Sequence, residues 1–304
     1  MASVGAATLG LTLSAGQVSA AGGGLIRYPA FKSAYVASRD VTVWLPDSYD
    51  PKGQALPVLY MHDGENLYES SHSLSGANWG VDVTVSRLIR DRQIRPVIVV
   101  GIASTKLRGR EYLPMRIFGA LPPATRDAVA ASWGGEPLSD DYLRFIVREL
   151  KPFVDQHFHT SPGPSDTFVM GSSMGGLVSF YAQSEYPTVF GGSASLSMHW
   201  LLGSPANLSQ PPDYLDQVTA AFNTYLTACA LSPGQHRIYI DQGTETLDAA
   251  YRPYSHSFER LMTARGWGVG GRFESLVFEG ADHSEKAWNE RLETPLRFLL
   301  GSRK

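Results

Sequence analysis

TFVMGSSMGGLVSFY, residues 167–181, is the stretch that decides the fold of this 304-residue chain. An apolar run of strand character leads into the pattern Gly-x-Ser-x-Gly at 171–175, and helical spacing follows it. This is the pattern of a nucleophile elbow, in which a serine stands at a strained turn between a strand and a helix. We therefore expect Ser173 to be a nucleophile, with the backbone N–H of Met174 directed at a developing oxyanion. The alternative is an ordinary Gly-Ser turn.

Extended and helical patterns alternate along the rest of the chain. Residues 81–92 and 139–154 have apolar positions at helical spacing, and a closing helix is expected at 288–299. Strand-like runs are expected at 41–45, 57–61, 96–102, 191–196, 237–241 and 273–278. This alternation predicts an α/β fold with a mostly parallel central sheet and helices on both faces.

The stretch 104–137 breaks this pattern. Prolines and glycines interrupt it, and neither helical nor strand periodicity is evident. A long irregular segment inside a compact domain is commonly functional, so we expect a lid or a substrate-lining insertion here. The helix that follows is expected to begin with Ser139 as its N-cap and to bend at Pro152.

Composition limits the classes of protein to consider. Hydrophobic residues make up 43% of the chain and charged residues 18%, so one large core can form, and we expect a single domain over 25–304. The net charge of −3 gives no reason to expect nucleic acid or an anionic membrane as a partner. No apolar run is long enough to span a bilayer. The single cysteine, Cys229, cannot form an internal disulfide and is expected to pack as a small apolar side chain.

Residues 1–24 are small and apolar, and no lysine or arginine occurs among them. They are expected to be either the remnant of a secretory signal that has lost its charged first part or a disordered N-terminal segment. A signal remnant implies export to the periplasm or the medium, whereas a disordered segment implies a cytoplasmic protein. The sequence does not indicate an oligomeric state.

A serine nucleophile needs a base that takes its proton and an acid that orients the base. In a sheet of this kind they lie after later strands, with the acid before the histidine. His283 follows the last expected strand and is the histidine whose position fits the base. Three carboxyl groups in the loop after the strand at 237–241 are candidates for the acid. Asp248 is the first choice, Glu245 is the alternative, and Asp241 also suits a structural role.

A second oxyanion donor is expected from the loop HDGENL at 62–67, which follows the strand at 57–61. Gly64 lets this turn approach the serine, so the backbone N–H of Glu65 is the expected donor. His62, Asp63 and Glu65 are also potential metal ligands, but they do not make a convincing ligand set, and we expect no metal and no other cofactor.

Several motifs agree in order and spacing with one known family. They are MHDGENL at 61–67, WGVD at 79–82, REY at 110–112, MGSSMGGL at 170–177, DQGT at 241–244, TLD at 246–248 and GADH at 280–283. On these motifs, residues 28–300 resemble the putative esterase family, which is the esterase D, feruloyl esterase and antigen 85 branch of the α/β-hydrolases. The resemblance implies an α/β-hydrolase fold with Ser173 as nucleophile, His283 as base and an acid after the strand at 237–241.

The chain departs from this family at two positions. Better-known members have the acid where this chain has Thr246, so the role must pass to Asp248 or Glu245. Many relatives have glutamine in place of Glu65. That change matters little if the oxyanion donor is a backbone N–H, but it alters specificity if the side chain contacts the substrate.

The expected function is therefore hydrolysis of a carboxylic ester, either of a small molecule or linked to a saccharide, through an acyl-enzyme intermediate. Acyl transfer to a sugar or an alcohol is one alternative, as the antigen 85 branch implies. A catalytically silent homologue that binds a ligand in the same cleft is another. Aromatic and histidine side chains that can line the cleft, or else pack in the core, are Trp79, Tyr112, His199 and Trp200.

Overall fold

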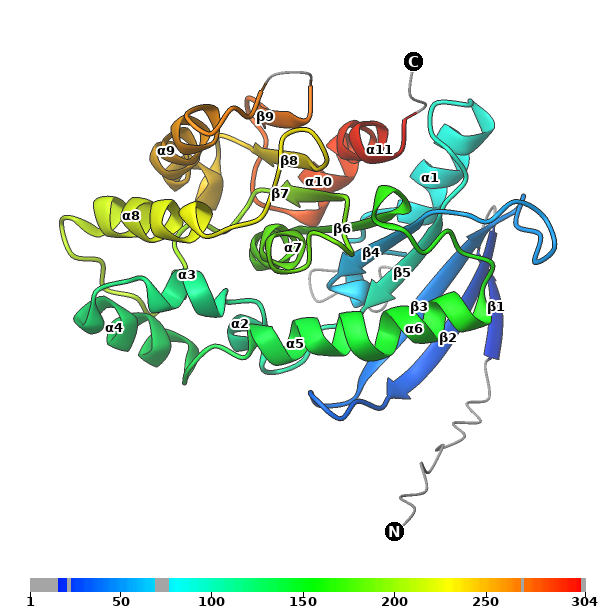
Figure 1. Ribbon diagram of the computed structural model, residues 1–304, viewed down its shortest axis with the longest axis horizontal. Coiled ribbons are helices and arrows are strands. Elements are labelled where there is room, and N and C mark those ends of the chain that lie inside the picture. The colour runs from blue at the N-terminus through cyan, green and yellow to red at the C-terminus, as the bar shows by residue number, and fades with distance from the viewer. Residues whose placement is uncertain (1–15, 21–22, 69–76, 269–270, 302–304) are drawn as a thin grey trace, which may run out of the picture.

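A computed structural model describes residues 16–20, 23–68, 77–268 and 271–301. Within these ranges the chain forms a nine-stranded sheet in the order β1-β2-β3-β5-β4-β6-β7-β8-β9 (Figure 1). The antiparallel strands are β1 (Gly16–Ala20), β2 (Gly23–Phe31) and β3 (Arg39–Pro46). They form one edge of the sheet and join the parallel strands through the pairing of β3 with β5.

Six strands of the sheet run parallel to one another. They are β4 (Val58–His62), β5 (Ile98–Ile102), β6 (Thr167–Ser172), β7 (Gly192–Leu196), β8 (Arg237–Gln242) and β9 (Phe273–Val277). Each lies within about two residues of a strand expected from the sequence, so the predicted α/β architecture is confirmed. Because parallel strands end at the same edge of the sheet, the loops after them converge there.

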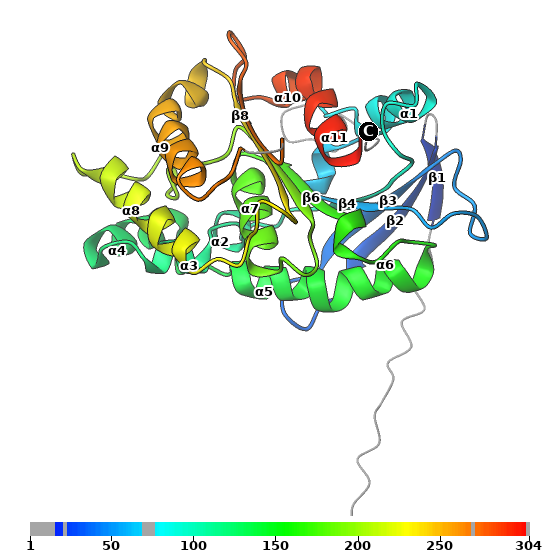
Figure 2. The same ribbon diagram turned by 45° about the horizontal axis from the view of Figure 1, so that its top comes forward.

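Helices cover both faces of the sheet (Figure 2). One face carries α1 (Val81–Arg90), α10 (Glu285–Arg291) and α11 (Glu293–Leu300). The other carries α5 (Ser139–Phe145), α6 (Lys151–His157), α7 (Met174–Glu185), α8 (Tyr214–Thr227) and α9 (Arg252–Thr263). Successive residues of β4 enter different hydrophobic clusters: Val58 and Tyr60 pack under α5–α9, and Leu59 and Met61 under α1 and α11. Because both faces of such a strand are buried, its sequence is apolar throughout and does not alternate with polar residues.

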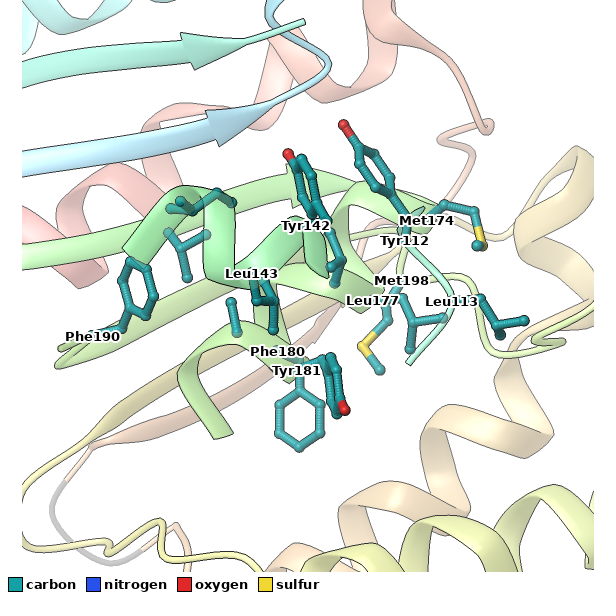
Figure 3. Close-up of a cluster of buried hydrophobic side chains, with 14 of the residues drawn as sticks. Tyr112, Leu113, Tyr142, Leu143, Met174, Leu177, Phe180, Tyr181, Phe190 and Met198 are labelled. Carbon is teal, nitrogen blue, oxygen red and sulfur yellow. The ribbon is translucent and has the colours of Figure 1, made fainter. Parts of the chain in front are cut away.

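Helix α7 lies in the centre of the larger cluster. Every residue from Met174 to Ser184 is buried, which accounts for its glycine, alanine and serine content and its lack of a polar face. Figure 3 shows Leu177, Phe180 and Tyr181 of this helix among the side chains of neighbouring elements. The helix that starts at the expected nucleophile is therefore anchored throughout its length.

The expectation that the stretch 104–137 has no regular structure was wrong. It contains three short helices, α2 (Arg108–Glu111), α3 (Met115–Gly119) and α4 (Pro123–Trp133). Pro114 and Pro122 are the N-caps of α3 and α4, and Gly134 ends α4 with a φ of 76°. The residues that interrupt the sequence pattern are thus helix boundaries. Trp133 Nε1 donates to the carbonyl oxygen of Leu202 at 2.7 Å, so the segment is fixed to the domain.

The helix expected at 139–154 extends to His157 but differs in two details. Leu138, not Ser139, is the N-cap of α5, and Ser139 Oγ instead accepts a hydrogen bond from the Met115 N–H at 2.9 Å. A π-helical turn, η3 (Ile146–Leu150), joins α5 to α6 directly before Pro152. Because proline has no N–H to donate, the wider turn accommodates the break that the sequence predicts as a bend.

Part of the segment expected to be a leader or disordered lies in the sheet. Residues 16–20 form β1, which pairs antiparallel with β2 from Gly16 opposite Arg27 to Ala20 opposite Gly23. Residues 1–15 and 21–22 lie outside the described residues, so their role as a signal remnant stays a prediction. Among the described residues, no helix combines the length and apolar character needed to cross a bilayer.

Candidate active site

Ser173 occupies the turn between β6 and α7. Its backbone has φ 54° and ψ −124°, a region that residues other than glycine rarely adopt. Two hydrogen bonds hold this conformation: the Ser173 N–H donates to the Leu196 carbonyl at 2.9 Å, and the Ser173 carbonyl accepts from the His199 N–H at 3.1 Å. The surrounding strands therefore impose the strained turn that exposes the hydroxyl.

Gly171 shows why the elbow needs glycine. A Cβ at this position would lie 2.6 Å from the carbonyl carbon of Gly175, closer than a side chain can approach a backbone atom. Strand β6 and helix α7 therefore fold back on each other only without a side chain at 171. The strand, turn and helix expected around Ser173 are all present.

His283 and Asp248 are in direct contact. His283 follows β9, and its Nδ1–H donates to Asp248 Oδ1 at 2.6 Å. Asp248 is fully buried, and its Oδ2 accepts from Ser197 Oγ and from the Gly243 N–H, each at 2.6 Å. Burial opposes ionisation of Asp248, but the hydrogen bonds from His283, Ser197 and Gly243 outweigh it and lower the pKa of this carboxyl. Asp248 is thus a carboxylate that holds the imidazole through Nδ1.

The two other candidate acids have different surroundings. Asp241 is buried, accepts from Arg291 Nη2 at 3.1 Å and from the Tyr239 hydroxyl at 2.8 Å, and does not reach His283. Burial raises its pKa, which the Arg291 guanidinium opposes. Glu245 is exposed at the start of the turn that carries Asp248. Of the three carboxyl groups left open by the sequence, Asp248 is the one beside the histidine.

Ser197 links the acid to the helix that follows the histidine. While its hydroxyl donates to Asp248, it accepts from Trp288 Nε1 at 2.9 Å and from Arg291 Nη2 at 2.7 Å, both on α10. Neither Trp288 nor Arg291 was singled out for a site role from the sequence, although both lie within the motif region that resembles the known family. Their side chains orient Ser197, and through it Asp248.

Ser173 and His283 line one pocket of about 360 Å³ at the carboxyl ends of the strands. The other residues lining it are Asp63, Glu65, Asn66, Ser104, Arg108, Ser172, Glu285 and Trp288. Trp288 is the only apolar side chain among them, and the carboxyl groups of Asp63, Glu65 and Glu285 outnumber the one guanidinium. The charges around the pocket therefore disfavour a ligand with a large negative charge.

The two expected oxyanion donors lie beside this pocket. Met174 is the first residue of α7, where backbone N–H groups have no partner within the helix. Glu65 lies in the short turn η1 (Gly64–Asn66), and its carboxylate accepts from the Ser104 N–H at 2.9 Å and from the Ser104 hydroxyl. This carboxylate thus joins the loop after β4 to the loop after β5.

Arg108 lines the pocket, as does Ser104, so the stretch 104–137 does contribute to the lining as expected, although neither residue was singled out from the sequence. Arg108 Nε and Nη2 donate to the two carboxylate oxygens of Asp63 at 2.6 and 2.8 Å. The pairing with Asp63 outweighs burial and raises the pKa of Arg108. Because the partners lie 45 positions apart and Arg108 falls in the stretch that lacked periodicity, no spacing signal pointed to the pair. The ion pair between Arg108 and Asp63 fixes α2 against the loop after β4.

The four side chains expected to line the cleft are buried in the core instead. Trp79 packs against Trp288 with ring centroids 5.7 Å apart and is 3% exposed, while Tyr112, His199 and Trp200 are at most 1% exposed. None of the four lines the described pocket that contains Ser173. Figure 3 shows Tyr112 beside Tyr142 and Met174 in the cluster under the elbow. Core packing, which the sequence left open as the alternative, is what the structure shows.

His62, Asp63 and Glu65 are each engaged by other groups. The His62 Nδ1 lies 2.7 Å from the Tyr142 hydroxyl, and burial lowers the pKa of this imidazole to about 3. Asp63 is held by Arg108, and Glu65 by Ser104. In the part of the chain that the structure describes, no group of three His, Cys, Asp or Glu side chains is arranged to hold a metal ion.

Comparison with known proteins identifies the family of this chain. A family model described as "Putative esterase" matches residues 34–299. The chain belongs to this esterase family. The resemblance predicted from the motifs is therefore confirmed, and membership makes the chain a carboxylic-ester hydrolase. In sequence it is 23% identical over 209 residues to the uncharacterized protein YbbA of Bacillus subtilis, covering 68% of this chain and 69% of that protein.

Solved structures of esterases have the same fold. A ferulic acid esterase superposes with a TM-score of 0.61 at 17% identity, covering 91% of this chain and 97% of that one. The enterobactin esterase FES from Shigella flexneri gives 0.60 at 18% identity, with 95% of this chain covered and 60% of that chain. An IroE-like serine hydrolase from Shewanella oneidensis gives 0.62 at 18% identity, over 91% of this chain and 80% of that chain. These likenesses confirm the α/β-hydrolase fold of the esterase domain.

Proposed function

We propose that this esterase works through an acyl-enzyme formed on Ser173, with His283 as the general base and Asp248 as the acid that orients it. The observation that supports this most strongly is the 2.6 Å contact of Asp248 Oδ1 with His283 Nδ1, because His283 lines the same pocket as Ser173. A histidine that donates from Nδ1 keeps Nε2 free to accept a proton.

In the proposed reaction, Ser173 Oγ attacks the ester carbonyl while His283 Nε2 takes its proton. The backbone N–H groups of Met174 and Glu65 stabilise the oxyanion, and His283 then gives the proton to the departing alcohol. A water molecule, deprotonated by the same imidazole, releases the acid from Ser173. The buried carboxylate of Asp248 stabilises the imidazolium in both steps.

Most side chains around the pocket are polar and can form hydrogen bonds with hydroxyl groups on the acyl or alcohol part of a substrate. The carboxylates of Asp63, Glu65 and Glu285 disfavour an anionic group at the pocket mouth. A ferulic acid esterase has the same fold, so an ester of a hydroxylated aromatic acid is the substrate class we propose.

The test is a burst-phase assay with p-nitrophenyl esters on the wild-type protein and Ser173→Ala. The proposal expects one equivalent of p-nitrophenol released rapidly by the wild type and none by the variant. Added glycerol or glucose then distinguishes hydrolysis from transfer, since a transferase forms the new ester faster than the free acid. Ester binding without turnover, unchanged in Ser173→Ala, would identify a silent binding protein instead.

A further inference from the structure

Glu285 lines the pocket that contains Ser173 and His283, but the proposed reaction does not use it. It follows His283 by two positions, is partly buried and lies in the first turn of α10. Within the ranges that the structure describes, its side chain makes no hydrogen bond and no ion pair. The carboxylate is therefore available to a group that the substrate brings into the pocket.

The other carboxylates of the pocket are already engaged with protein groups. Asp63 accepts from Arg108 Nε and Nη2 at 2.6 and 2.8 Å, so these two charges compensate each other. The Glu65 carboxylate accepts from the Ser104 N–H at 2.9 Å and from the Ser104 hydroxyl, and neither donor is charged. While His283 is in the neutral form that acts as base, negative charge is in excess among the residues that line the pocket. Such a pocket attracts a cation.

The neighbours of Glu285 in the helix do not account for its carboxylate. The N-terminus of α10 is capped by Ser284, whose Oγ accepts from the Ala287 N–H at 3.3 Å. The adjacent cation, Lys286, has its Nζ 3.9 Å from Glu290 Oε1, one turn further along the helix. Glu285 thus neither caps the helix nor pairs with the lysine beside it.

Trp288 accompanies Glu285 at the pocket. The two residues are three positions apart, which places them on one face of α10, and both line the pocket. The Trp288 ring lies nearly perpendicular to the His283 ring, with centroids 5.1 Å apart. An indole ring beside a carboxylate is a combination that attracts an organic cation, through the charge of the one and the electron-rich ring of the other.

The place of His283 indicates which part of the ester meets these two side chains. In the proposed reaction His283 Nε2 takes the proton of Ser173 and gives it to the alcohol oxygen, so the alcohol departs on the histidine side of the pocket. Glu285 and Trp288 lie on that side, because one follows His283 by two positions and the other packs against its ring. The group that they meet is therefore carried by the alcohol.

We propose that Glu285, with Trp288 beside it, makes the enzyme selective for esters whose alcohol part carries a positive charge, that is, esters of amino alcohols. The proposal rests on the proposed function and names the alcohol half of its substrate. The carboxylate attracts the ammonium group as the ester enters, and this contact holds the alcohol oxygen within reach of His283. Glu285 exchanges no proton and forms no bond in the reaction.

The test compares two esters of the same acid. One is the choline ester, and the other is its uncharged isostere, in which carbon replaces the quaternary nitrogen. The acid is the one whose p-nitrophenyl ester gives the largest burst, and the measured quantity is the ratio of the two kcat/KM values. For the wild type we expect the choline ester to be favoured about 3- to 10-fold, the contribution of one partly exposed charge pair with an aromatic neighbour. Glu285→Gln keeps the shape of the side chain and removes its charge, so the preference should disappear.

Glu290→Gln is the matched control. Glu290 is on the same helix, its side chain is 65% exposed, and it does not line the described pocket. The variant is expected to keep the wild-type ratio. Because both esters are cleaved by the same Ser173, the ratio is insensitive to any general loss of activity that a substitution causes.

Three results would overturn the proposal: a wild type that does not prefer the choline ester, a ratio that is unchanged in Glu285→Gln, or a ratio that falls as much in Glu290→Gln as in Glu285→Gln. Failure of the proposed function itself looks different. In that case the wild type gives no burst with any p-nitrophenyl ester, or Ser173→Ala gives the same burst as the wild type.

Discussion

Asp248 Oδ1 and His283 Nδ1 lie 2.6 Å apart although 35 positions separate the two residues in the chain. Their loops follow β8 and β9, which are adjacent parallel strands, so the sheet itself brings them together. The other carboxylate oxygen, Asp248 Oδ2, accepts from the Ser197 hydroxyl and the Gly243 N–H. These two hydrogen bonds fix the carboxylate, so that Oδ1 faces the imidazole.

Asp248→Asn should lower kcat by about 10³- to 10⁴-fold, because an amide cannot stabilise the imidazolium and favours the wrong tautomer of His283. Glu245→Gln is the matched control, since the Glu245 side chain is exposed. It is expected to keep nearly full activity. Steady-state hydrolysis of p-nitrophenyl acetate measures both, and a larger loss in Glu245→Gln would assign the acid to that residue instead.

The pKa of Asp248 also predicts a pH dependence of stability. The folded protein lowers this pKa, so the carboxylate contributes stability above the unfolded value of about 3.9, and the contribution is lost as pH falls through the folded pKa. The difference in unfolding free energy between the wild type and Asp248→Asn should therefore shrink as the pH falls below about 4. Urea titrations between pH 3 and pH 7 measure it, and a difference that grows at low pH would contradict the lowered pKa.

Arg291→Met should destabilise the fold by about 3 to 5 kcal/mol, because it leaves the carboxylate of Asp241 buried without its cation. The Arg291 and Asp241 side chains are 3% and 0% exposed. Arg144→Met removes an exposed ion pair with Asp141 and should cost about 1 kcal/mol or less. Equal shifts of the two urea midpoints would show that burial of the Arg291 pair does not govern its contribution.

Gly171→Ala should prevent the elbow from closing, since the new Cβ would lie 2.6 Å from the backbone of Gly175. We expect loss of the burst together with a destabilisation of several kcal/mol, as for other overpacked sites. Gly119→Ala is the control: nothing lies within 4 Å of its Cβ, and alanine is the better helix former by about 1 kcal/mol. Thermal unfolding of the two variants should shift in opposite directions.

Glu65→Gln tests whether this carboxylate contacts the substrate. Its oxygens accept from the Ser104 N–H and hydroxyl, which implies a role in holding the loop and not in reading the ester. The variant should lower kcat by less than about tenfold and leave the order of preference in an ester series unchanged. A changed order of preference would show that the side chain itself selects the substrate.

The local pattern of the sequence sufficed for the elbow and for where the parallel strands lie along the chain. Gly-x-Ser-x-Gly between a strand and a helix depends on backbone geometry within a few residues, and runs buried on both faces are apolar whatever packs on them. His283 was a candidate base for the same reason, because it follows the last strand in the sequence closely.

The tertiary structure alone decided which of three nearby carboxyl groups faces His283, because Asp241, Glu245 and Asp248 differ in direction and burial but not in strand order. It also decided that Trp79, Tyr112, His199 and Trp200 pack in the core. The local sequence around such a side chain is the same whether it lines a cleft or packs in a hydrophobic cluster. Arg108 with Asp63, and Tyr251 with His199, join residues that are 45 and 52 positions apart. Such contacts exist only once the loops converge at the edge of the sheet, so no local spacing encodes them.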